Sequence, residues 1–90
     1  MNPRLIELLM QGQARVIFVK KTNNLTRNIL CTLRKDNIPP EEHHTLAKIM
    51  DNLNEPRLIV WDLEKNFWRS FYHSSIIDII EVETLNSIEE

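Results

Sequence analysis

The apolar positions in the first third of the chain predict a helix followed by two strands. Residues 4–10 are rich in leucine and isoleucine, and they predict a short helix that stops at Gly12, the only glycine of the chain. Residues 13–22 contain a β-branched and aromatic run, and residues 25–35 alternate apolar and polar side chains, as strands do. Between them, Thr22–Asn24 predicts a hairpin turn, because asparagine tolerates left-handed backbone.

The middle of the chain changes to a helical period. Residues 39–54 open with two prolines, which a helix accepts in its first turn, and with two glutamates that suit the positive end of a helix dipole. Apolar side chains then follow at i, i+3, i+4 and i+7, namely Leu46, Ile49, Met50 and Leu53. We therefore expect one inserted helix with a single apolar stripe.

The last third of the chain returns to strand patterns. Residues 57–63 and 67–72 predict two strands joined by a three-residue loop, with Asn66 in the left-handed position. Residues 75–83 predict a fifth strand, and residues 84–90 predict a flexible tail.

Taken together, these elements predict an α+β fold that is mostly β. It is a small five-stranded antiparallel barrel with a short N-terminal helix and the inserted helix, forming one domain over residues 1–83. The composition agrees, because 42% hydrophobic and 27% charged residues are typical of a globular chain. No run of about 18 apolar residues predicts a membrane span. The single cysteine, Cys31, favours a reducing compartment, so we expect a cytoplasmic protein.

Four short segments resemble a family of small proteins of tailed bacteriophages. The segments are Thr26-Arg27 with Cys31-Thr32-Leu33, Trp61-Asp62-Leu63, Trp68-Arg69-Ser70-Phe71 and Ser75-Ile76-Ile77, within roughly residues 15–83. That family is described as a WYL-type, Sm-like small barrel with Src-homology-3-like topology. The resemblance therefore implies this fold and a phage accessory protein that acts in an infected bacterium.

The chain departs from that family pattern in two places. Asn23-Asn24 stands where the first hairpin of the family often turns through glycine. The consecutive Trp-Tyr-Leu triplet of the related bacterial regulator domains is absent, so the ligand-sensing residues of those domains have no counterpart here.

Charge is distributed unevenly along the chain, although the net charge is only −2. Residues 1–35 carry seven basic side chains and one acidic side chain, whereas residues 76–90 carry five acidic and no basic ones. One explanation is that the two ends pair as neighbouring strands. The other is that the basic segment forms an exposed face for phosphate or for an acidic partner.

The candidate binding residues combine the basic segment with an aromatic hairpin at residues 61–72. Its aromatic side chains either fill a second small core beneath a helix, or leave Trp68 and Tyr72 exposed to stack bases or to anchor a protein. The candidates for binding a partner or nucleic acid are Arg15, Lys20, Lys21, Arg27, Arg34, Lys35, Arg57, Trp68, Arg69 and Tyr72.

Side chains that often carry catalysis or metal binding form no recognisable motif. His43 and His44 are adjacent, so on a helix they point about 100° apart and cannot chelate one ion together. His73 lies near three serines, but the sequence shows no nucleophile elbow and no orienting carboxylate. Cys31 is expected to be a small buried apolar residue. We predict no metal, no cofactor and no enzymatic activity.

The sequence thus predicts a non-catalytic binding module that acts through its strand faces on a host or phage protein in the host cytoplasm. A pI of about 5.9 favours a protein partner over nucleic acid. The alternative is an Sm-like nucleic-acid binder that uses the basic first hairpin and the aromatic second hairpin. The strand at residues 75–83 is apolar on both faces, so it is either central or covered, or it is an edge that pairs with a second copy to form a homodimer.

Overall fold

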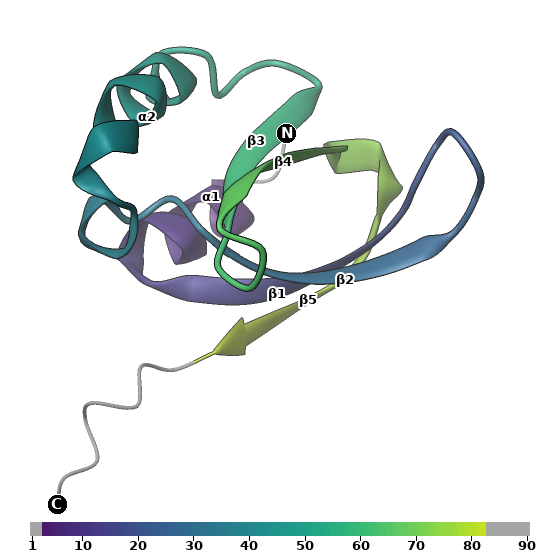
Figure 1. Cartoon of the computed structure of the whole chain (residues 1–90). Coiled ribbons are helices and arrows are strands. Elements are labelled where there is room, and N and C mark those ends of the chain that lie inside the picture. Colours follow the sequence, from purple (N-terminus) through teal and green to yellow (C-terminus); the bar gives the residue numbers. More distant parts are fainter. Residues whose placement is uncertain (1–2, 83–90) are drawn as a thin grey trace, which may run out of the picture.

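The computed structural model describes residues 3–82 and is shown in Figure 1. Helix α1 (Pro3–Gln11) leads into strands β1 (Gln13–Val19) and β2 (Thr26–Thr32). Two 3-10 turns, η1 (Lys35–Asn37) and η2 (Pro40–Glu42), then precede helix α2 (His43–Met50). The second half contains β3 (Arg57–Asp62), β4 (Phe67–Tyr72), the 3-10 turn η3 (His73–Ser75) and β5 (Ile76–Val82). The predicted tail at 84–90 lies outside the described residues, as does Glu83 at the end of the predicted fifth strand.

The five strands form one antiparallel sheet in the order β4-β3-β2-β1-β5. Strands β2 and β3 pair only through Cys31 with Asp62 and Thr32 with Trp61, so the sheet bends sharply there (Figure 1). The bend brings β1 and β4 together across the interior, where the rings of Phe18 and Phe71 stack with centroids 4.9 Å apart. The predicted mostly-β fold with five antiparallel strands and two helices is confirmed.

One face of the sheet and the apolar faces of both helices enclose the core. Strand β1 alternates buried and half-buried side chains, because successive residues of a strand point to opposite faces. Helix α1 contributes Leu5, Ile6 and Leu9, and its last turn is tied to the end of β2 by a hydrogen bond from the Leu33 N–H to the Leu9 carbonyl at 2.9 Å. The outer face of β1, with its neighbours on β2 and β5, remains outside this core.

The turn of the first hairpin is longer than the sequence pattern predicts. Strand β1 ends at Val19 rather than Thr22, and the loop is closed by a hydrogen bond from the Lys20 N–H to the Leu25 carbonyl at 2.8 Å. Asn24 takes the left-handed conformation, with φ of 60°, and the Asn23 side chain accepts the Leu25 N–H. The left-handed asparagine turn is confirmed, but Lys20 and Lys21 lie outside the strand.

The second hairpin differs from the prediction by one residue of register. Its loop has four residues, because Asp62 ends β3 and its Oδ1 accepts the N–H groups of both Glu64 and Lys65 at 2.9 Å. This carboxylate turn draws Leu63 out of the strand. Asn66 is left-handed as predicted, with φ of 62°. The resulting register sets Trp61 opposite Trp68 and Arg57 opposite Tyr72.

The inserted helix is shorter than the predicted span of residues 39–54. Pro40 opens the short turn η2 instead, and α2 runs only from His43 to Met50. It stops there because the Asn52 side-chain amide donates to the Lys48 carbonyl at 2.8 Å. In a longer helix the backbone N–H of Asn52 would donate to that carbonyl. The apolar stripe is confirmed: Leu46 and Ile49 are buried, while Met50 and Leu53 pack against the core.

The basic and acidic ends of the chain do pair as neighbouring strands, β1 with β5. Among residues 3–82, however, no ion pair joins these two strands. Arg15 of β1 binds Glu64 of the second hairpin instead, with Nη2 2.8 Å from Oε2. None of the helices in the described part of the chain is both long enough and apolar enough to cross a bilayer.

Candidate binding surfaces

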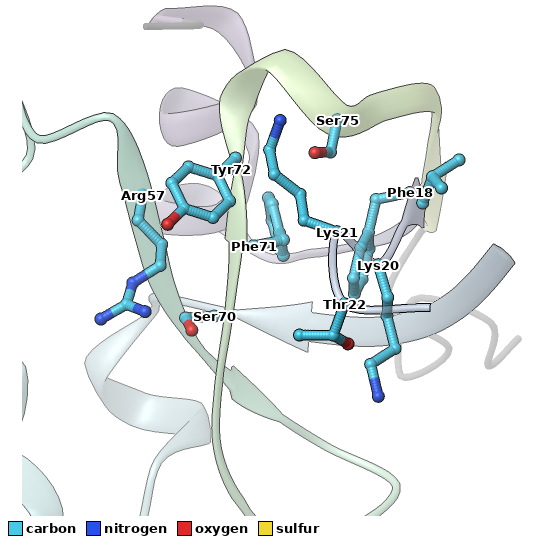
Figure 2. A pocket seen from close by; sticks show the side chains of 10 residues that line it. Phe18, Lys20, Lys21, Thr22, Arg57, Ser70, Phe71, Tyr72 and Ser75 are labelled. Carbon is cyan, nitrogen blue, oxygen red and sulfur yellow. The ribbon is translucent and has the colours of Figure 1, made fainter. Parts of the chain in front are cut away.

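A pocket of about 170 Å³ opens where the first hairpin turn meets the end of the second hairpin (Figure 2). Four of the ten candidate binding residues line it, namely Lys20, Lys21, Arg57 and Tyr72. The remaining lining residues are the hydroxyl-bearing Thr22, Ser70 and Ser75, together with Phe18, Val19 and Phe71. We call this the basic pocket. It contains three cationic side chains and no carboxylate.

Tyr72 sits between two of these cations. The Nζ atom of Lys21 lies 5.1 Å from the centre of the Tyr72 ring, a cation–π contact, and Arg57 is the direct neighbour of Tyr72 across the β3–β4 ladder. Figure 2 shows Lys21 and Arg57 on either side of the ring, while the Lys20 amine points away from it. Lys21 therefore lies over one face of the Tyr72 ring.

The other basic candidates lie elsewhere, and most of them have partners. Arg15 forms an ion pair with Glu64. Arg34 Nη2 lies 3.4 Å from Asp36 Oδ2, and Arg69 Nε lies 3.9 Å from Oδ2 of the buried Asp62. The hydrogen bond raises the pKa of Arg15 and lowers that of Glu64. Arg27 is half-buried opposite Phe18, and Lys35 borders a groove beside α2. The basic residues therefore do not form one continuous face.

Trp68 is partly buried and packs against the core of the barrel. Its ring packs edge-on against the buried Trp61 with centroids 5.1 Å apart, and its Nε1–H donates to Glu42 of η2 at 2.9 Å. Both the ring and its polar atom thus have partners within the fold. Tyr72, by contrast, is exposed, so the exposed Trp68–Tyr72 pair does not form.

A second surface is formed by β5, the edge strand that pairs with β1 and, among residues 3–82, with no other strand. Ile77 and Ile80 are 60% and 45% exposed, respectively. Ile77 has no partner on β1, because the ladder passes from Asp78 to Ile76 across a bulge. The two ionisable side chains of the strand, Asp78 and Glu81, are exposed carboxylates. We call these four residues the β5 surface.

The outer sheet face beside the β5 surface is also partly apolar. Ile80 lies opposite Arg15 in the β1–β5 ladder, and Leu30 lies opposite Arg15 on the other side. Ile17 follows two positions along β1, so it shares that outer face, and both Ile17 and Leu30 are only half-buried. The Arg15 guanidinium forms an ion pair with Glu64, and the apolar side chains of Leu30 and Ile80 lie on either side of Arg15 in the sheet.

Cys31, His43 and His73 each have a ring nitrogen or a thiol within the fold. Burial raises the pKa of the Cys31 thiol to about 12, and the charge of Asp62 adds to the effect. The predicted buried Cys31 is therefore confirmed. His43 Nε2 lies 2.8 Å from the Ile38 carbonyl oxygen. His73 has both ring nitrogens buried, with no hydrogen-bond partner within residues 3–82.

The sequence interpretation missed how these residues are grouped. One of its two explanations of the charge pattern placed the basic side chains on one exposed face, whereas only Lys20, Lys21 and Arg57 line a pocket with Tyr72 and the other basic candidates are dispersed. The sequence signal for this grouping was Asp62, whose side chain favours a four-residue turn. With that turn, the register of the second hairpin sets Arg57 opposite Tyr72. No local sequence pattern identifies Thr22, Ser70 and Ser75 as residues that line this pocket.

Comparison with known proteins agrees with this architecture. The family described as WYL_2, Sm-like SH3 beta-barrel fold matches residues 2–77, which is most of the chain. The chain therefore belongs to that family. No curated protein and no solved structure gives a significant match.

Proposed function

We propose that this member of the WYL_2 family is a non-catalytic binding module that docks a protein partner on the β5 surface and the adjoining outer sheet face. The observation that carries the proposal is the exposure of Ile77 and Ile80 on an edge strand. Solvent-facing isoleucines on an unpaired edge favour association, and soluble proteins usually protect such strands. The strand motifs resemble those of small phage proteins, so we place the activity in the cytoplasm of an infected bacterium.

The charge of the β5 surface supports a partner segment that combines apolar with basic side chains. Asp78 and Glu81 flank the exposed isoleucines, and β5 has no cation of its own. A second copy of β5 would bring no cation to pair with these carboxylates. The Asp78 side chain also accepts the Ile79 N–H at 2.8 Å, so one backbone donor of the strand is already occupied. We therefore propose a heterologous protein partner held mainly by side chains.

The surroundings of the reactive side chains support a non-catalytic role. A serine nucleophile needs a histidine within hydrogen-bond reach, yet neither ring nitrogen of His73 contacts a hydroxyl group in the described region. A thiol with a pKa of about 12 is almost entirely protonated at neutral pH, so Cys31 is a poor nucleophile.

Affinity capture from a bacterial lysate, with and without nuclease, tests the proposal. We expect the unmodified chain to capture a protein whether or not nuclease is present. The Ile80→Lys variant should no longer capture this protein, whereas the Ile59→Lys variant should capture it as the unmodified chain does. Ile59 is a matched control, because it is 36% exposed on β3 and lines a groove beside α2. Capture that nuclease abolishes would instead support the nucleic-acid alternative. Capture that survives Ile80→Lys would remove the β5 surface from the proposal.

A further inference from the structure

We propose that the basic pocket binds a phosphate dianion, either free or as the phosphate group of a small phosphorylated molecule. This inference concerns a separate set of residues and does not rest on the β5 surface. It follows from the size, the charge and the aromatic wall of the pocket.

The size of the pocket suits a chemical group rather than a whole ligand. Sites that enclose a complete small molecule usually measure about 300–1,000 Å³. At about 170 Å³ the basic pocket is smaller, but it holds one tetrahedral anion together with the atoms next to it. Phe18 and Phe71, whose rings stack, also line the pocket, so an anion there would meet both charged and apolar side chains.

The cations of the basic pocket have no carboxylate partner in the described part of the chain. Within residues 3–82, the recorded ion pairs use Arg15, Arg34 and Arg69, and none involves Lys20, Lys21 or Arg57. The lining contains no carboxylate that would compete for them. In a chain with a net charge of −2, three basic residues without an ion pair among residues 3–82 thus line one small hollow, and the Lys21 amine and the Arg57 guanidinium lie on either side of Tyr72.

The side chains around the hollow match the chemistry of a phosphate group. The guanidinium of Arg57 can donate two parallel hydrogen bonds to phosphate oxygens, and lysines act as mobile point charges. Thr22, Ser70 and Ser75 supply hydroxyl donors at the wall. A nucleic-acid strand fits less well, because Lys21 already lies over the Tyr72 ring and the Trp68 indole N–H donates to Glu42, so a stacking base would compete with one of these contacts.

A titration followed by amide NMR tests the proposal. Inorganic phosphate and glycerol 3-phosphate are added separately, with chloride balancing the ionic strength. We expect saturable shifts at Lys21, Ser70, Tyr72 and Ser75. Tighter binding of glycerol 3-phosphate would identify an ester as the ligand, and equal or tighter binding of inorganic phosphate would identify the free anion.

Two variants and one matched control complete the test. Lys21→Gln and Arg57→Gln should each weaken binding about tenfold, the usual effect of losing one charged hydrogen bond. Lys65→Gln changes an exposed lysine in the turn of the second hairpin, outside the basic pocket, and should bind as the unmodified chain does.

Three results would overturn the proposal. The first is that chloride alone produces the same shifts, the second is that both pocket variants bind normally, and the third is that an oligonucleotide without a terminal phosphate competes equally well. Ile80→Lys should leave phosphate binding unchanged, so failure here is distinguishable from failure of the proposed protein docking.

Discussion

Trp68 and Tyr72 lie on the same side of β4, yet their polar atoms give them different environments. The Trp68 indole N–H reaches Glu42, which the Pro39-Pro40 turn places above the hairpin, so this side chain becomes part of the interior. Tyr72 lies four residues further along β4, beside Arg57 and Lys21. Strand parity alone cannot separate the two residues, because the difference comes from a segment more than twenty residues away in the chain.

His73 gives the stability of the fold a dependence on pH. Burial of its ring lowers the pKa of His73 below the ordinary value of 6.5, so the unfolded chain binds a proton more readily than the folded chain. The free energy of unfolding therefore has its full value above pH 6.5 and decreases as the pH falls toward the lower pKa of the folded state. Urea denaturation between about pH 8 and pH 5 measures this.

Two histidine variants separate His73 from general effects of acid. His73→Phe should remove most of the pH dependence in that range, whereas His44→Gln should keep it, because His44 is exposed on α2. An unchanged slope in His73→Phe would show that other groups cause the loss of stability.

At the scale of elements, α2 is held to the barrel by its apolar stripe, and this contact can be tested directly. Ile49 is 7% exposed within the core, whereas Ala47, two residues away on the same helix, is exposed. Ile49→Asp should destabilise the fold by at least the roughly 2–5 kcal/mol of a buried isoleucine truncation, because it also buries an unpaired charge. Ala47→Asp should change the melting temperature little. Equal melting temperatures for Ile49→Asp and the unmodified chain would show that α2 is an exposed appendage.

The elements could be predicted from the sequence wherever one local rule decides the structure. Alternation and runs of β-branched or aromatic residues predicted the strands, and asparagine at two turns predicted left-handed backbone that the structure confirms at Asn24 and Asn66. The ends of elements were less predictable, because side chains compete for the same backbone groups there. Asp62 lengthened one loop, the Lys20–Leu25 hydrogen bond lengthened another, and Asn52 shortened the inserted helix.

At the scale of the whole molecule, the bent sheet separates two surfaces of opposite charge. The basic pocket lies where the first hairpin turn meets the end of the second, and the acidic β5 surface lies along one sheet edge. The sequence showed both charges, but their location depends on which strands pair. Lys21 and Arg57 are far apart in the chain and meet only because the barrel folds β4 over the first hairpin.

The docking of a protein on the β5 surface is tested most directly by site-specific photo-crosslinking in a bacterial lysate. A benzophenone amino acid replaces Ile80 in one variant and Ile59, the exposed isoleucine of β3, in the other. We expect a protein other than a second copy of the chain to be cross-linked from position 80 and not from position 59. The yield should be unaffected by nuclease and reduced by a competing peptide of alternating lysine and valine. Equal cross-linking from both positions, or a product from position 80 that contains only the chain itself, would contradict the proposed function.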